Sequence, residues 1–182
     1  FVNDFQRLTK VDASSGLPKR IDEVANLARK NSIKCCEEDL RLLFEAASME
    51  PTRLRTRHLL TVAVLNVLAY NVREPAAMDF LFVESENDED GPETPCVTYS
   101  GPTLQYTDGL QLTVDKKRLF SVSNAEEGLA ALMAAYFIFN IKYPSKAYNT
   151  LVAAEWLLFG LQSTSPRMPV TKLLNKVKKI IK

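Results

Sequence analysis

Residues 129–140 read Leu-Ala-Ala-Leu-Met-Ala-Ala-Tyr-Phe-Ile-Phe-Asn, a stretch that is apolar all the way around a helix and meets no charge before Lys142. The preceding Asn124 and Glu127 have the spacing of a helix start, in which each side chain accepts from the other residue's backbone amide. A helix that is apolar on every side must be buried, in a protein core or in a membrane. A bilayer span needs about 20 apolar residues, so we expect this helix at the centre of a soluble domain.

The composition is that of a globular protein. The chain has 182 residues, of which 46% are hydrophobic and 25% are charged, the usual balance for a folded domain. The formal net charge is +1, so binding to nucleic acid or to a membrane surface would depend on local patches. Three cysteines, two of them adjacent, make a poor disulfide framework, which favours an intracellular location, in the nucleus or the cytoplasm. Because the chain begins at Phe1, we expect it to be part of a larger protein.

The spacing of apolar residues predicts helices at both ends of the chain and strands in the middle. The predicted helices cover about residues 19–31, 36–49, 52–71, 125–141, 145–159 and 169–182. Short apolar and β-branched segments predict strands at about 79–83, 96–99, 103–107, 110–114 and 118–122. The dipeptide Asp108-Gly109 lies between two of these segments and predicts a hairpin. Helices and strands that are segregated in this way are typical of an α+β fold.

We therefore expect one composite domain over residues 1–182, mostly helical, with a small antiparallel sheet within about residues 79–122. Residues 84–95 are an acidic run with Pro and Gly, which is typical of a solvated loop. This loop could join two lobes, a helical one over 19–75 and one of strands and helices over 96–182. The buried helix is expected to pack against residues 148–159.

No catalytic or metal-binding motif stands out. His58 is the single histidine, and a Ser-His-Asp or Cys-His device would need it, but beside three arginines it is expected at the surface or its boundary. Cys35, Cys36 and Cys96 lack the paired spacing of a structural zinc site. The acidic loop departs from a calcium-loop pattern at Pro92, and the glycines form no phosphate-binding fingerprint. We therefore expect no enzyme activity, no catalytic residue, no metal and no cofactor.

Arginines at the start of the 52–71 helix are candidates for an anion-binding surface. Arg53 and Arg57 are four residues apart and share a helix face, whereas Arg55 points elsewhere. Arginine forks suit phosphates and carboxylates. Three further cations could join them in a basic patch, namely Lys34, Arg41 and Arg73. The alternative is a charged helix start that pairs with Glu45, Glu50 or the acidic loop.

The C-terminal helix, over 170–182, has one apolar and one basic face. The apolar face is the candidate partner-binding surface and consists of Val170, Leu173, Leu174, Val177, Ile180 and Ile181. The basic face carries Lys172, Lys176, Lys178, Lys179 and Lys182. Such a helix could dock into a partner's groove, form an oligomer seam, lie on an anionic surface or pack into the domain's own core. If it is free, removing it leaves a folded domain that loses its partner, and if it is core, the domain unfolds.

One part of the chain resembles a known group of proteins. Residues 119–122 read Leu-Phe-Ser-Val, and residues 136–144 read Tyr-Phe-Ile-Phe-Asn-Ile-Lys-Tyr-Pro. Over about residues 102–160 this pattern resembles the C-terminal region of uncharacterised, multi-copy animal proteins labelled sterile-alpha-motif-like or mobile-element-associated. The resemblance implies a folded accessory or interaction region of a larger protein, in a nuclear or mobile-element context. It carries over no catalytic residue.

These observations favour a non-catalytic protein-interaction or assembly module, whose partner is another protein or a second copy of the chain. The alternative is a nucleic-acid-binding domain whose affinity falls steeply with salt. The candidate residues for that alternative are Arg53, Arg55, Arg57, Lys172, Lys176, Lys178 and Lys179. A third alternative is an enzyme assembled from scattered polar residues. No membrane span is expected.

Overall fold

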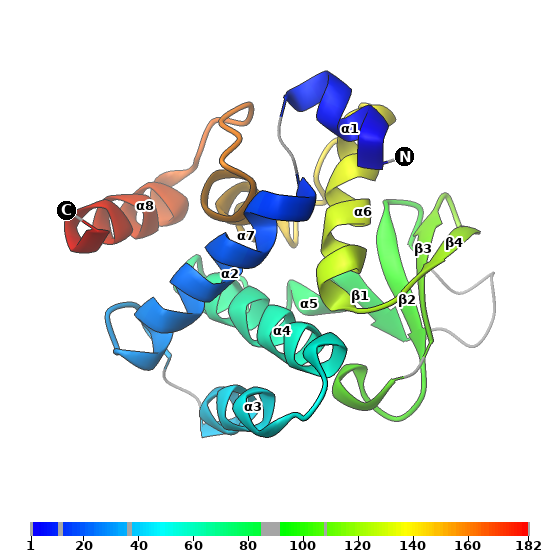
Figure 1. Ribbon diagram of the computed structural model, residues 1–182. Coiled ribbons are helices and arrows are strands. Elements are labelled where there is room, and N and C mark those ends of the chain that lie inside the picture. Colours follow the sequence, from blue (N-terminus) through cyan, green and yellow to red (C-terminus); the bar gives the residue numbers. More distant parts are fainter. Residues whose placement is uncertain (1, 11–12, 36–37, 85–91, 108, 182) are drawn as a thin grey trace.

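The computed structural model describes residues 2–10, 13–35, 38–84, 92–107 and 109–181 and shows an α+β fold (Figure 1). The elements, in chain order, are α1 (Val2–Thr9), α2 (Ala13–Arg29), α3 (Glu38–Met49), α4 (Arg53–Asn71), α5 (Met78–Leu81), β1 (Phe82–Glu84), β2 (Cys96–Ser100), η1 (Leu104–Tyr106), β3 (Gly109–Val114), β4 (Lys117–Val122), α6 (Ala125–Ile138), α7 (Tyr148–Ala154), η2 (Glu155–Phe159) and α8 (Met168–Ile181). The η1 element is a 3₁₀ turn and η2 is a π-helical turn.

All six predicted helices are present, and α6 begins as its sequence predicts. The side chain of Asn124 accepts a hydrogen bond from the amide of Glu127, at 2.9 Å. The reciprocal bond differs from the prediction, because the carboxylate of Glu127 accepts from the amide of Ser123, at 2.7 Å, instead of that of Asn124. The hydrogen bonds of this cap therefore reach back to Ser123, one residue earlier than expected. They fix the backbone of the short connection between β4 and α6.

Within the described residues the sheet has four strands in the order β1-β2-β3-β4, and it is mixed. β2 pairs antiparallel with β3, and β3 with β4, as predicted, but β1 pairs parallel with β2, with Phe82 opposite Val97. The prediction of an antiparallel sheet is therefore wrong at this edge. Apolar spacing along a strand indicates which face is buried and not the direction of its neighbour, so the sequence contained no signal for a parallel pair.

The hairpin predicted at Asp108-Gly109 does not join the two segments that were expected. The expected strand at 103–107 contains the 3₁₀ turn η1, and β3 begins at Gly109 and pairs with β2. The tight hairpin lies between β3 and β4, where Asp115 and Lys116 have φ of 51° and 61°. Left-handed φ at both central residues is the turn geometry that matches the twist of paired strands. Asp108 itself lies outside the described residues.

The helix α6 forms the middle layer, between the sheet and the other helices (Figure 1). Leu129, Leu132 and Met133 are fully buried in it. A Cβ on Gly128 would meet the side chain of Val97 at 3.3 Å, so this glycine lets α6 approach β2 closely. On its other side α6 packs against α4, and α7 contacts α4 in turn. The expected packing of the buried helix against 148–159 is therefore not its main contact, because α4 lies against both.

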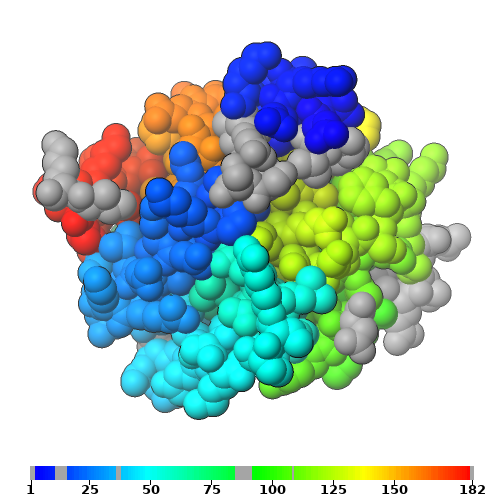
Figure 2. All heavy atoms as spheres, viewed as in Figure 1, coloured from blue at the N-terminus to red at the C-terminus, as the bar shows by residue number. Residues whose placement is uncertain are grey.

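The buried apolar side chains form one cluster that extends from Phe5 in α1 to Val177 in α8. The strands and α8 lie at opposite ends of the molecule in Figure 1, and Figure 2 shows them (green and red) at opposite edges of the same face. Most of the predicted acidic loop, residues 85–91, lies outside the described residues. Within the described ranges, no helix is both long enough and apolar enough to cross a bilayer.

Candidate anion-binding groove

The apolar face of α8 packs into the domain's own core. Four of the six predicted partner-binding residues are at most 6% exposed, namely Val170, Leu173, Leu174 and Val177. Ile180 is 40% exposed, and the side chain of Ile181 lies outside the described residues. As a partner-binding surface this face is therefore largely covered, and the own-core alternative explains the apolar spacing, since each buried aliphatic side chain is worth about 1.5–3 kcal/mol.

The lysines of α8 lie on its outer side and divide between two hollows. Lys172 and Lys176 line a groove at the end of α4, whereas Lys178 lines a different hollow that α8 forms with α2. Lys179 is exposed, and Lys182 lies outside the described residues. The predicted basic face is thus present, but only part of it faces the groove.

Arg57 is a buried structural residue, which corrects its prediction as a nucleic-acid contact. It is 9% exposed. Its guanidinium donates to the carboxylates of Glu126 and Asp22, the latter at 2.5 Å, and to the carbonyl of Pro18 at 3.0 Å. Burial alone would lower the pKa of Arg57, but the hydrogen bonds and charges of Glu126 and then Asp22 raise it above its ordinary value. The side chain connects α2, α4 and α6, and four of its five N–H donors are already used within the fold.

Arg53 and Arg55 do not form a common surface with Arg57. Arg55 donates to the carbonyl of Gln105, at 2.7 Å, and lies 4.0 Å from the carboxylate of Glu50. The pairing with Glu50 is the alternative that the sequence left open for these arginines. Arg53 is exposed at the start of α4. The three arginines therefore have three different environments, and the predicted patch does not exist as a unit.

A different set of cations meets in a groove of about 720 Å³ between α8, the end of α4 and the segment that precedes α3. We call it the basic groove. Its cations are Lys34, Arg73, Lys172 and Lys176, and its other lining residues are Tyr70, Asn71, Pro75, Met168, Pro169 and Leu173. The sequence grouped Lys34 and Arg73 with Arg41, but Arg41 lies on α3 and bonds Glu38 at 3.4 Å.

The end of α4 holds Lys34 and Arg73 in place. The side chain of Asn71 accepts from the amide of Lys34, at 3.2 Å, and donates to its carbonyl, at 2.8 Å. Arg73 has φ of 65°, and the amides of Arg73 and Glu74 donate to the carbonyls of Tyr70 and Ala69. This is the helix-ending motif in which glycine usually occupies the left-handed position. Here an arginine occupies it, close to the negative end of the helix dipole.

Glu74, the residue after Arg73, does not neutralise the basic groove. Its carboxylate accepts from the amides of Asn149 and Thr150, at 3.0 and 2.8 Å, at the start of α7. The hydroxyl of Thr150 donates to it as well, at 3.0 Å. Among the described residues, no carboxylate forms an ion pair with the groove cations, Lys34, Arg73, Lys172 and Lys176. The groove is therefore a concave surface with concentrated positive charge.

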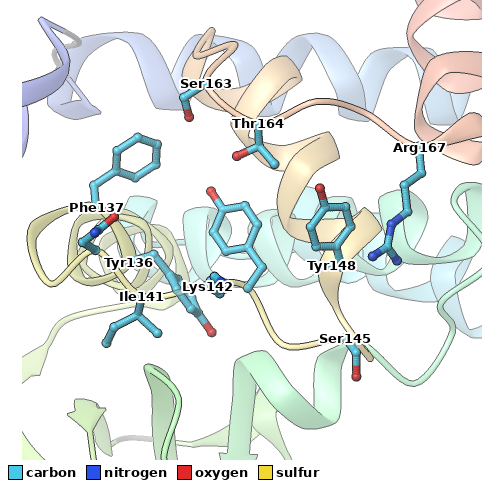
Figure 3. Close-up of a pocket in the computed structure, with 11 residues that line it drawn as sticks. Tyr136, Phe137, Ile141, Lys142, Ser145, Tyr148, Ser163, Thr164 and Arg167 are labelled. Carbon is cyan, nitrogen blue, oxygen red and sulfur yellow. The ribbon is translucent and has the colours of Figure 1, made fainter.

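A second hollow, of about 470 Å³, lies beyond the start of α8 (Figure 3). We call it the tyrosine pocket. Its lining residues are Tyr136, Phe137, Asn140, Ile141, Lys142, Tyr143, Ser145, Tyr148, Ser163, Thr164 and Arg167. The ring of Tyr143 meets the rings of Tyr136 and Tyr148 edge to face, with centroids 5.0 and 6.3 Å apart. The guanidinium carbon of Arg167 lies 3.9 Å from the centroid of the Tyr148 ring.

A buried carboxylate organises the wall of the tyrosine pocket. Glu155, at the start of the π-helical turn, is fully buried. One of its oxygens accepts from the amide and hydroxyl of Ser163 and from the amide of Thr164, at 2.7, 2.8 and 2.9 Å. The other accepts from the hydroxyl of Tyr143, at 3.0 Å. Burial, and then the charge of Glu155, raise the pKa of Tyr143, so this phenol stays protonated and the pocket wall is fixed.

His58 is buried, at 3% exposure, and not at the surface as expected. Its Nδ1 accepts from the amide of Ala125, at 3.1 Å, and its Nε2 lies 2.8 Å from the carbonyl of Leu104. Both ring nitrogens are therefore occupied by backbone groups. Burial lowers its pKa. Among the described residues, no three His, Cys, Asp or Glu side chains are placed to hold a metal ion.

Comparison of the chain with family models, with curated proteins and with solved structures found no match. The resemblance of residues 102–160 to multi-copy animal proteins therefore stays a prediction.

Proposed function

We propose that this chain binds nucleic acid, without catalysis, and that the phosphates of the nucleic acid lie in the basic groove. The observation that supports this proposal is the convergence of Lys34, Arg73, Lys172 and Lys176 on one hollow in which no described carboxylate pairs with them. Lysine and arginine side chains supply most of the affinity of proteins for nucleic acid, because each neutralised phosphate releases counterions. The proposal includes an intracellular location, in the nucleus or the cytoplasm, where such a ligand is found.

The packing of α8 favours a polymer in the groove over a membrane surface. A basic helix that lies on a membrane inserts its apolar face among the lipids. The apolar face of α8 is occupied by the core instead, with Val170 fully buried and Val177 at 4% exposure. The groove cations also come from three separate segments around a hollow, which suits a chain of phosphates that threads between them.

The test is fluorescence anisotropy with labelled oligonucleotides, over about 50 to 200 mM salt. Four phosphate contacts predict a plot of log affinity against log salt with a slope of about −3. The test variant is Lys172→Glu/Lys176→Glu, and its matched control is Lys178→Glu/Lys179→Glu, on the same helix and with the same charge change but outside the groove. We expect the groove variant to lose more than tenfold in affinity and the control to lose much less.

Three results would overturn the proposal. The first is an equal loss in both variants, which would mean that net charge alone attracts the oligonucleotide. The second is displacement of the oligonucleotide by polyglutamate at equal charge concentration, which would mean that the groove recognises acidic protein segments. The third is tighter binding of anionic lipid vesicles than of the oligonucleotide, which would point to a membrane surface.

The second candidate function is the protein-interaction or assembly role that the sequence favours. With α8 packed into the core, the observation that supports it is a set of exposed apolar side chains on and beside α3. Leu42 and Met49, seven residues apart on one face of that helix, are 53% and 83% exposed, and Leu54 is 50% exposed. Sedimentation equilibrium of the chain and of Leu42→Ser/Met49→Ser tests self-association. A monomeric mass for the unsubstituted chain would exclude the hypothesis that the chain forms a homo-oligomer.

A further inference from the structure

The basic groove and the tyrosine pocket are neighbours, joined at two places. Arg167 lines the tyrosine pocket, and the next two residues, Met168 and Pro169, line the basic groove. Glu74 follows the groove residue Arg73, and its carboxylate holds the amide of Asn149, the residue after the pocket's Tyr148. The two rims are thus connected through the chain and through a hydrogen bond, so one extended ligand can reach both.

The walls of the tyrosine pocket suit a flat aromatic group with a polar edge. The rings of Tyr143 and Tyr148 supply aromatic surface, whereas Tyr136 is only 2% exposed. The exposed Asn140 supplies a polar edge, and Ser163 and Thr164, which Glu155 holds, complete the polar wall. Figure 3 shows Phe137 and Ile141 at one end of the pocket and Tyr148 with Arg167 at the other, below Ser163 and Thr164. A volume of about 470 Å³ is within the usual range for small-molecule sites, which is ample for one base.

Two cations line the tyrosine pocket and are available to the phosphates that adjoin an inserted base. Arg167 and Lys142 line the pocket, and both are exposed. Arg167 directly precedes Met168 and Pro169 of the basic groove, so positive charge is present on both sides of the junction between groove and pocket. The part of the pocket wall formed by Ser163 and Thr164 is held by Glu155, whose carboxylate accepts hydrogen bonds from both residues. The pocket is therefore formed before any ligand binds, and little ordering is needed on binding.

We propose that the nucleic acid bound by this chain is single-stranded, with one unpaired base inserted in the tyrosine pocket while the adjoining phosphates lie in the basic groove. This inference rests on the proposed function. A base in a duplex is paired and stacked, and it must leave the stack to enter a pocket. Base stacking on aromatic side chains is worth about 5- to 150-fold in affinity per base, which a bare phosphate backbone does not gain.

The experiment compares three ligands on the whole chain: a short oligothymidylate, an abasic oligomer with the same number of phosphates, and a duplex of equal length. The test variant is Tyr148→Leu, which removes the ring at the pocket. The matched control is Tyr106→Leu, because Tyr106 is also near an arginine, Arg55, but is 70% exposed outside the pocket. We expect the test variant to bind oligothymidylate about tenfold more weakly and the abasic oligomer as before, and the control to change neither.

The single tryptophan gives a second readout. The indole of Trp156 donates to the carbonyl of Thr164, at 3.0 Å, on the pocket wall. Oligothymidylate should therefore change the tryptophan emission, and the abasic oligomer should not. Equal binding of oligothymidylate and abasic oligomer, or tighter binding of the duplex, would overturn the inserted base and leave the groove proposal standing. Loss of all binding in Lys172→Glu/Lys176→Glu, with base dependence retained in the unsubstituted chain, would support both.

Discussion

The Nδ1 atom of His58 accepts a hydrogen bond from the backbone amide of Ala125, at 3.1 Å. This bond connects the first half of α4 to the first residue of α6. An acceptor at Nδ1 places the ring proton on Nε2, where it is donated to the carbonyl of Leu104. The ring is therefore neutral and holds α4, α6 and η1 together. A proton added to Nδ1 would break the bond to Ala125 and place a charge in a buried site.

This relationship predicts acid lability. Burial lowers the pKa of His58 in the folded state, so below about pH 6.5 the unfolded state takes up a proton that the folded state does not. The contribution of neutral His58 to the free energy of unfolding is complete above about pH 6.5 and is lost as the pH falls below it. Urea unfolding at about pH 7.5 and about pH 5.5 should show a loss of about 1 kcal/mol beyond that of His58→Gln. Equal losses in the two proteins would mean that His58 is not the group that titrates.

Removal of Arg57 is predicted to destabilise the fold. Arg57→Met leaves Glu126, 16% exposed, and Asp22 without their partner, and breaking a buried ion pair in this way costs about 3 kcal/mol. Denaturant unfolding measures the change. The control is Arg53→Met, one turn earlier and exposed, which should change stability by about 0.5 kcal/mol or less. If Arg57→Met unfolds like the control, the ion pair is not a main support of the fold.

Arg73 is predicted to combine a cost in stability with a gain in binding. Its φ of 65° is strained for a side chain, at about 1 kcal/mol, and Arg73→Gly relieves that strain. We expect this variant to unfold at a higher temperature and to bind oligonucleotide more weakly. Arg73→Lys should keep the strain and most of the binding. A glycine variant that is less stable than the unsubstituted chain would show that the arginine stabilises the helix end by contacts of its own.

Two glycines are predicted to respond in opposite ways to alanine. Gly160 has φ of 68° and faces the guanidinium of Arg20, which a Cβ would displace, so Gly160→Ala should cost about 1–2 kcal/mol. Gly16 lies in α2 with nothing within 4 Å of a Cβ, so Gly16→Ala should gain about 0.5 kcal/mol. Thermal unfolding of both variants checks the pair. A gain at Gly160 would contradict the left-handed geometry of that turn.

The helices could be predicted because their apolar residues repeat with helical spacing, and α6 because no side of it is polar. The parallel pairing of Phe82 with Val97 could not, since strand spacing has no direction. Arg57 was misjudged because its partners are 35 and 69 residues away in the sequence. Likewise Lys34 and Lys172 line one groove only because Asn71 holds Lys34 at the end of α4 and α8 packs against α4. Charges that depend on such distant contacts are neutralised or concentrated by the fold, and local spacing contains no signal for either.

The burial of α8 has a practical consequence for anyone who trims this chain. Residues 163–169 read Ser-Thr-Ser-Pro-Arg-Met-Pro, which looks like a convenient place to end a shorter version. Ending the chain there would uncover the core that Val170, Leu173 and Leu174 now close, and would also remove one wall of the basic groove. If a shortened protein failed to bind a ligand, the cause would be loss of the fold and not loss of a binding residue. Point substitutions on the outer side of α8 are therefore the way to separate ligand recognition from folding.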